Sequence, residues 1–172
     1  MKLDDDDFAL MGLPRQFALE RAELDRRWRE LQTQVHPDRF AAEGAAAQRL
    51  AMQWAVRVNE AYARLKTPLS RAAYLCELRG APINAERNTA MPPAFLMQQM
   101  TWREALDDAR TQAAVESLDA DVTRAEAELL RQAGQCLDVD GDAEAASGHV
   151  RSLMFIARFR ADVARRIDAL DP

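Results

Sequence analysis

The stretch Val35-His36-Pro37-Asp38-Arg39-Phe40 decides how this sequence is organised. Pro37 has no amide hydrogen and a fixed φ, so it disfavours a helix through this point and moves His36 out of the α region. Asp38 supplies an acceptor that can cap the next segment or face a partner. Because a His-Pro-Asp tripeptide alone is compatible with a simple turn, its flanks must decide whether it has a function.

Amphipathic helices are predicted on both sides of the tripeptide, because apolar residues recur there at helical spacing. The upstream stripe consists of Leu24, Trp28, Leu31 and Val35, and the downstream stripe of Leu50, Trp54, Val58, Ala61, Tyr62 and Leu65. Two such helices joined by a short loop bury their stripes against each other, which predicts an antiparallel hairpin. His36, Pro37 and Asp38 then lie at its exposed tip, and Arg26 and Arg29 fall on the opposite face of the first helix.

The composition indicates a soluble all-α protein. The chain has 172 residues, of which 30% are charged and 6% aromatic, with six glycines. No run of alternating β-branched residues predicts a strand. The net charge of −5 is unevenly placed: residues 1–75 hold 12 basic against 11 acidic side chains, and residues 76–172 hold 11 against 17. Nucleic acid is therefore not an expected partner, since phosphate binding needs a clustered basic surface.

Targeting and redox signals are equally sparse. No apolar run reaches the roughly 20 residues that a membrane-spanning helix needs, and no secretory signal opens the chain. The two cysteines, Cys76 and Cys136, are too few and too far apart for a metal motif or a disulfide framework. We expect both to be buried small apolar residues in a reducing cytoplasm. No cofactor is expected.

A second domain is predicted after a segment dense in helix breakers, from Gly80 to Pro93. We expect a first domain over 1–78, a linker over 79–93 and an antiparallel three-helix bundle over 94–172, with helices near 94–110, 111–137 and 143–170. The stretch Asp138–Asp142 is expected to be a turn. It does not fit a calcium loop, because its glycine is the fourth residue rather than the sixth, and the twelfth position is His149.

The first bundle helix carries more apolar surface than a bundle needs. Its core face is formed by Phe95, Trp102, Leu106 and Ala109. Leu96, Met97 and Met100 lie on the other side, around Glu104, and a second apolar face favours a partner. Alternatively, these residues pack under the linker or against the first domain. Phe155 and Met154 on the third helix either extend this surface or join the core, and a core role is more usual for Phe155.

The hairpin resembles a J-domain, the helical module that stimulates ATP hydrolysis by DnaK-type chaperones. The similarity covers roughly residues 5–75 and rests on the stretch Val35–Phe40, Asn59-Glu60-Ala61-Tyr62 with Leu65, and Ser70-Arg71-Ala72-Ala73-Tyr74. The resemblance implies that His36, Pro37 and Asp38 contact the chaperone, together with Arg26 and Arg29. The helix that carries these arginines is less basic than is usual in the family.

The whole chain resembles the HscB-type co-chaperones of iron–sulfur cluster assembly. The segments that carry this similarity are Arg71–Leu75, Ala94–Met100 and Val150–Phe155. The resemblance implies an L-shaped protein whose bundle binds an IscU-type scaffold and whose J-domain delivers it to an HscA-type chaperone. The implied scaffold-binding residues are Leu96, Met97, Met100, Glu104 and Phe155. The sequence departs from the family at three positions: Met100 stands where the family often has leucine, Thr101 where an acidic residue is usual, and Met154 where a basic residue can occur.

The resemblance also implies a bacterial, cytoplasmic and monomeric adaptor that makes no bond itself. Two other functions do not fit the sequence, and a third stays open. An enzyme with His36 as general base lacks a nucleophile and an oxyanion hole. A protein that carries the cluster itself lacks cysteine ligands. A general J-domain protein with a different client, or with a bundle that serves as spacer or dimerisation device, stays open.

Overall fold

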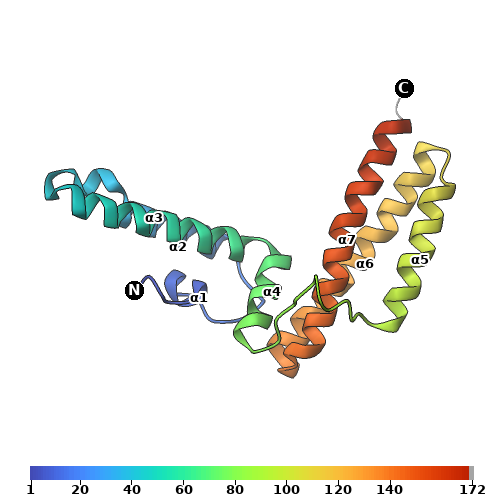
Figure 1. The fold of residues 1–172 in the computed structure, drawn as a ribbon, viewed down its shortest axis with the longest axis horizontal. Helices are drawn as coiled ribbons and strands as arrows, with labels where there is room; N and C mark the ends of the chain where they lie inside the picture. The colour runs from blue at the N-terminus through green and yellow to red at the C-terminus, as the bar shows by residue number, and fades with distance from the viewer. Residues whose placement is uncertain (171–172) are drawn as a thin grey trace. The chain divides into compact units, whose positions relative to one another are not determined.

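A computed structural model describes residues 1–170. All regular structure in this range is helical, as predicted, and it contains no β-strand (Figure 1). The elements are α1 (Asp7–Met11), α2 (Arg21–Val35), the 3₁₀-helix η1 (Pro37–Glu43), α3 (Ala45–Lys66), α4 (Pro68–Leu78), α5 (Pro93–Asp108), α6 (Gln112–Gln135), the π-helical turn η2 (Cys136–Asp140) and α7 (Ala143–Leu170). None of these helices is both long and apolar enough to cross a membrane.

The chain divides into two compact units, Met1–Leu75 and Cys76–Pro172. The division falls within α4, a few residues before the boundary expected near residue 80. Pro68 at the first position of α4 supports its start, because a proline there loses no helical hydrogen bond. Each unit has its own buried apolar residues, and each is described separately below.

Unit 1 is built on the predicted hairpin of α2 and α3, which run side by side in Figure 1. Leu24 of α2 and Val58 of α3 are fully buried. Trp28 stacks on Tyr62 with ring centroids 4.8 Å apart, and packing of this kind stabilises a core beyond the area it buries. Leu50 differs from expectation, since 49% of it is exposed. The short η1 also packs against α3.

The short α1 is fixed to α3 by a buried carboxylate. Asp7 is fully buried and forms ion pairs with Arg57 at 2.7 Å and Arg64 at 3.0 Å. Its backbone N–H donates to the Tyr74 hydroxyl at 3.0 Å. The neighbouring Asp6 caps the helix by accepting from two backbone N–H groups.

The connection between α2 and α3 is more regular than the predicted short turn. Residues 37–43 form one 3₁₀-helix, and α3 begins only at Ala45. Between them Gly44 adopts φ 94° and ψ 170°, a backbone conformation that is essentially restricted to glycine. The tip is therefore a short helix closed by a glycine.

Unit 2 contains the predicted bundle of α5, α6 and α7. The two long helices α6 and α7 pack along each other, and α5 lies against both. Aromatic rings join α5 to α7: Trp102 lies 6.0 Å from Phe159, and Phe95 lies 5.8 Å from Phe155, measured between ring centroids. The core residues are Phe95, Trp102, Leu106, Val115, Leu118, Val122, Val150, Leu153, Ile156, Phe159 and Val163.

The connection between α6 and α7 corrects two expectations. The stretch expected as a turn begins inside a π-helical turn that extends α6 to Asp140, and Gly141, at φ 67°, ends it. A π-helical turn is a local widening of a helix. Cys136 lies at its start and is only half-buried, whereas Cys76 is fully buried as expected.

The breaker-rich linker is fixed by one arginine. Arg151 of α7 is 5% exposed, and its guanidinium donates to the Ile83 carbonyl at 3.1 Å and the Ala90 carbonyl at 3.0 Å. A third donation reaches the Ser147 hydroxyl at 3.3 Å. Charged donors bonded to buried carbonyls make strong hydrogen bonds, so the linker is held along α7.

Candidate protein-interaction sites

The end of α2 presents the His-Pro-Asp tripeptide to solvent. His36 is the C-cap of α2 and has extended backbone angles, φ −60° and ψ 127°, because Pro37 follows it. The backbone N–H of Asp38 donates to the His36 Nδ1 atom at 3.3 Å. The side chain of His36 is 57% exposed and that of Asp38 is 91% exposed. Both can therefore reach a partner.

The two predicted basic residues lie further back along α2. Arg26 and Arg29 precede His36 by about two to three helical turns. Arg26 is ion-paired on both sides, with Glu23 and Glu30. These hydrogen bonds, above all the one with Glu23, raise the pKa of Arg26. Much of its charge is thus neutralised within the helix, while Arg29 is exposed.

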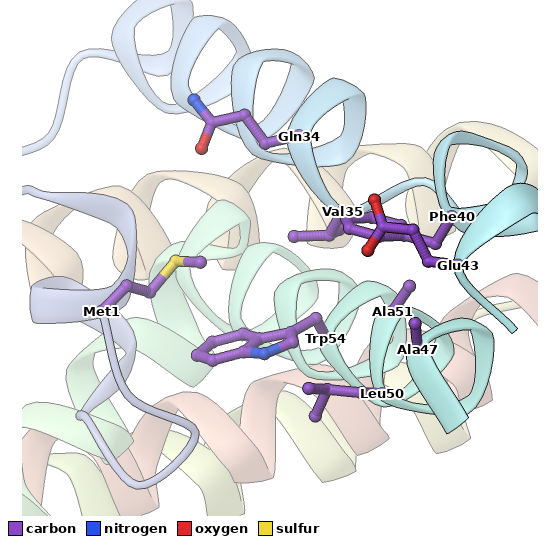
Figure 2. Close-up of a pocket in the computed structure, with 9 residues that line it drawn as sticks. All are labelled: Met1, Gln34, Val35, Phe40, Glu43, Ala47, Leu50, Ala51 and Trp54. Atoms are coloured by element: carbon purple, nitrogen blue, oxygen red, sulfur yellow. The ribbon is translucent and has the colours of Figure 1, made fainter. Parts of the chain in front are cut away.

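An apolar pocket of about 390 Å³ lies beside the tip, and the sequence did not predict it (Figure 2). Its walls come from the start of the chain, the end of α2, η1 and the first half of α3. The lining residues are Met1, Gln34, Val35, Phe40, Glu43, Ala47, Leu50, Ala51 and Trp54. The exposed side of Leu50 faces this pocket, and the spacing of Ala47, Leu50 and Trp54 is the signal that could have indicated it.

The second candidate site is an apolar surface on α5. Leu96 is 45% exposed, Met97 73% and Met100 67%. The opposite face of the same helix buries Phe95 and Trp102. The three residues are therefore not packed under the linker. We call Leu96, Met97, Met100, Glu104 and Phe155 together the α5 patch.

A hollow of about 340 Å³ joins part of this patch into one site. It is lined by Gln99, Met100, Arg103, Glu104 and Phe155. Phe155 is half-buried, and it stacks on Phe159 with centroids 5.9 Å apart, so it has both a core contact and an accessible side. Leu96 and Met97 precede the hollow by one turn of α5.

Arg103 and Gln99 line the hollow but were not among the predicted residues. Arg103 donates to Asp162 of α7 at 2.9 Å, and its guanidinium lies 5.1 Å from the centroid of Phe159. The hydrogen bond with Arg103 lowers the pKa of Asp162. Gln99 lies three residues after Leu96 and next to Met100, and this spacing could have indicated it. The position of Arg103 depends on Asp162 and could not be predicted. Met154 does not join this site and instead lines a separate hollow beside residues 83–87.

Known proteins resemble this chain along its whole length. A family model described as "HSCB C-terminal oligomerisation domain" matches residues 91–164. The co-chaperone protein HscB homolog of Cupriavidus taiwanensis is 51% identical over 173 residues, covering 99% of this chain and 98% of that protein. This chain belongs to the HscB co-chaperone family. The resemblance to HscB-type co-chaperones is thus confirmed.

Solved HscB structures share the fold. The chaperone HscB from Vibrio cholerae aligns with a TM-score of 0.81 at 37% identity, covering 96% of this chain and 99% of that chain. The human co-chaperone HscB aligns with a TM-score of 0.86 at 27% identity, covering 96% and 84%. The relatives are named as chaperones or co-chaperones, not as enzymes. This HscB-family chain is a J-domain co-chaperone. The roles of the individual site residues stay predictions.

Proposed function

We propose that this HscB-family chain is an adaptor that binds an IscU-type iron–sulfur scaffold protein and stimulates ATP hydrolysis by an HscA-type chaperone. The observation that carries the proposal is the exposure of Leu96, Met97 and Met100 beside a hollow, on a helix whose other face is already buried. Methionine side chains suit a binding surface, because they are flexible and polarisable. The scaffold occupies the α5 patch, with Glu104 at its polar edge.

The chaperone side of the proposal rests on the tip of unit 1. His36 and Asp38 project from the end of α2, and Pro37 fixes the backbone between them. These side chains and Arg29 bind the chaperone in its hydrolysis-competent state, so the chemical step belongs to the chaperone. Because Arg26 is paired with Glu23 and Glu30, electrostatic attraction contributes less to this contact than in a more basic helix.

Because both surfaces belong to one chain, scaffold binding is coupled to chaperone stimulation. A scaffold bound to the α5 patch is held near any chaperone bound at the tip, which raises its effective concentration there. No cofactor takes part in this step. The adaptor acts in cytoplasmic iron–sulfur cluster assembly and transfer.

Calorimetric titration with a purified IscU-type scaffold tests the proposal. We expect the Leu96→Ala/Met97→Ala/Met100→Ala variant to lose at least about thirtyfold in affinity, since central apolar contacts dominate binding energy. Met52→Ala/Val56→Ala removes exposed apolar side chains from α3 instead and should bind like the wild type. Equal affinity of the triple variant and the wild type would rule out the α5 patch.

Self-association is a second candidate for the bundle. The matching family model describes residues 91–164 as an oligomerisation domain, and a second copy of the chain could cover the same apolar surface. The adaptor proposal expects a monomer over the whole concentration range in sedimentation velocity. A dimer that the triple variant abolishes would favour self-association.

A further inference from the structure

The methionines of this chain differ sharply in exposure. Met97 and Met100 are 73% and 67% exposed, whereas Met11 in unit 1 is 1% exposed. Met91 and Met154 of unit 2 are half-buried. The two most exposed methionine side chains of the chain are thus one turn apart, in the middle of the α5 patch.

The other sulfur atoms of unit 2 are less available to an oxidant. Burial raises the pKa of the Cys76 thiol to about 11, and burial also raises the pKa of Cys136. Both therefore remain protonated near neutral pH, and the thiolate is the reactive form of cysteine. A thioether needs no deprotonation, so an exposed methionine reacts whenever the oxidant can reach it.

We infer that Met97 and Met100 form an oxidation-sensitive site, at which hydrogen peroxide converts the thioethers to sulfoxides and thereby weakens binding to the α5 patch. The inference rests on the proposed scaffold binding and adds its regulation. A sulfur lone pair attacks one peroxide oxygen, and the O–O bond breaks. The sulfur is oxidised by two electrons, and the departing hydroxide takes up the remaining proton to leave as water.

The oxidised side chain no longer suits an apolar interface. A sulfoxide is polar and accepts hydrogen bonds, so burying it against an apolar partner carries a desolvation cost. On the unbound protein Met100 is 67% exposed, so its sulfoxide can accept hydrogen bonds from water. Oxidation therefore favours the unbound surface over the bound one.

The test compares scaffold binding before and after peroxide treatment of the full chain. Peroxide is removed before the scaffold is added, sulfoxides are mapped by peptide mass spectrometry, and affinity is measured by calorimetry. We expect Met97 and Met100 to oxidise before Met91 and Met154, and the affinity to fall by at least about tenfold as they do. Treatment with the two methionine sulfoxide reductases, one for each epimer, should restore binding.

Variants locate the effect. Met97→Leu and Met100→Leu, separately and together, are compared by the ratio of their own affinities before and after peroxide, and we expect this ratio to approach one in the double variant. Met52→Leu removes an exposed methionine of unit 1 and should leave the wild-type loss unchanged. Full oxidation without loss of affinity overturns this inference alone. Absence of binding before any treatment overturns the proposed function and the inference together.

Discussion

His36 is oriented by the backbone that follows it. Its Nδ1 atom accepts the N–H of Asp38, so the neutral imidazole carries its proton on Nε2. The ring therefore offers a donor away from the chain, next to a carboxylate that is almost fully exposed. This combination of one outward donor and one outward acceptor is what the tip can present to a chaperone.

Asp7 should be the most sensitive acidic residue of unit 1. Asp7→Asn keeps the shape of the side chain but leaves Arg57 and Arg64 without their shared buried charge. We expect the free energy of unfolding of unit 1 to fall by about 3–5 kcal/mol, as measured by urea denaturation. Asp4→Asn is the matched control at an exposed position and should change it by less than about 0.5 kcal/mol. Similar stabilities of the two variants would contradict the buried ion pairs.

Cys76 should resist alkylation in the native protein. Burial raises its pKa from 9.0 to about 11, so at pH 8 its thiolate fraction is about a hundredfold lower than in the unfolded chain. We expect the rate of iodoacetamide labelling, followed by mass spectrometry in a Cys136→Ser background, to differ at least to that extent between native protein and protein in urea. Equal rates would show that Cys76 is accessible.

The same pKa shift has a stability consequence. Between the unfolded and folded pKa values the unfolded chain has released the thiol proton and the native chain retains it. The native state binds more protons there, so stability is complete below about pH 8.5 and falls as pH rises towards 11.

At the scale of elements, the start of α3 depends on one glycine. Gly44 has φ 94°, so Gly44→Ala should destabilise unit 1 by about 1–3 kcal/mol through backbone strain alone, since no heavy atom lies within 4 Å of the added Cβ. Gly148→Ala is the matched control inside α7, where the added Cβ meets only Pro92 at 3.9 Å. It should stabilise the protein by up to about 1 kcal/mol. Thermal unfolding of both variants checks the opposite signs.

The elements that periodicity could predict were those with a long apolar stripe. Leu24, Val58, Trp102 and Phe159 each belong to such a stripe, on four different helices, and all four are buried. The 3₁₀-helix after His36 and the π-helical turn at Cys136 were missed, because such short elements carry no apolar stripe.

Contacts between residues far apart in the chain could not be predicted from the sequence either. Arg151 binds carbonyls 61 and 68 residues away, and nothing near it in the chain indicates that it is buried. The α5 patch could be proposed because its apolar residues exceed what one buried face needs. Arg103 could not, since its position depends on Asp162 of another helix.

At the scale of the molecule, the adaptor proposal requires both surfaces in the same chain. A mixture of His36→Gln protein and the α5 triple-alanine variant contains one working tip and one working patch, on different molecules. We expect this mixture to lack the scaffold-dependent stimulation of chaperone ATPase that wild-type protein gives at equal concentration, because tethering is lost. His36→Gln alone should keep wild-type scaffold affinity. Full stimulation by the mixture would show that the two surfaces act independently.

The attachment of α1 also affects when unit 1 can fold during synthesis. Asp7 is synthesised 50 to 67 residues before its partners Arg57, Arg64 and Tyr74. At roughly 5–20 residues per second this delay is roughly 3–13 s. Unit 1 therefore completes its fold only when α1 packs against a segment that is synthesised 67 residues later.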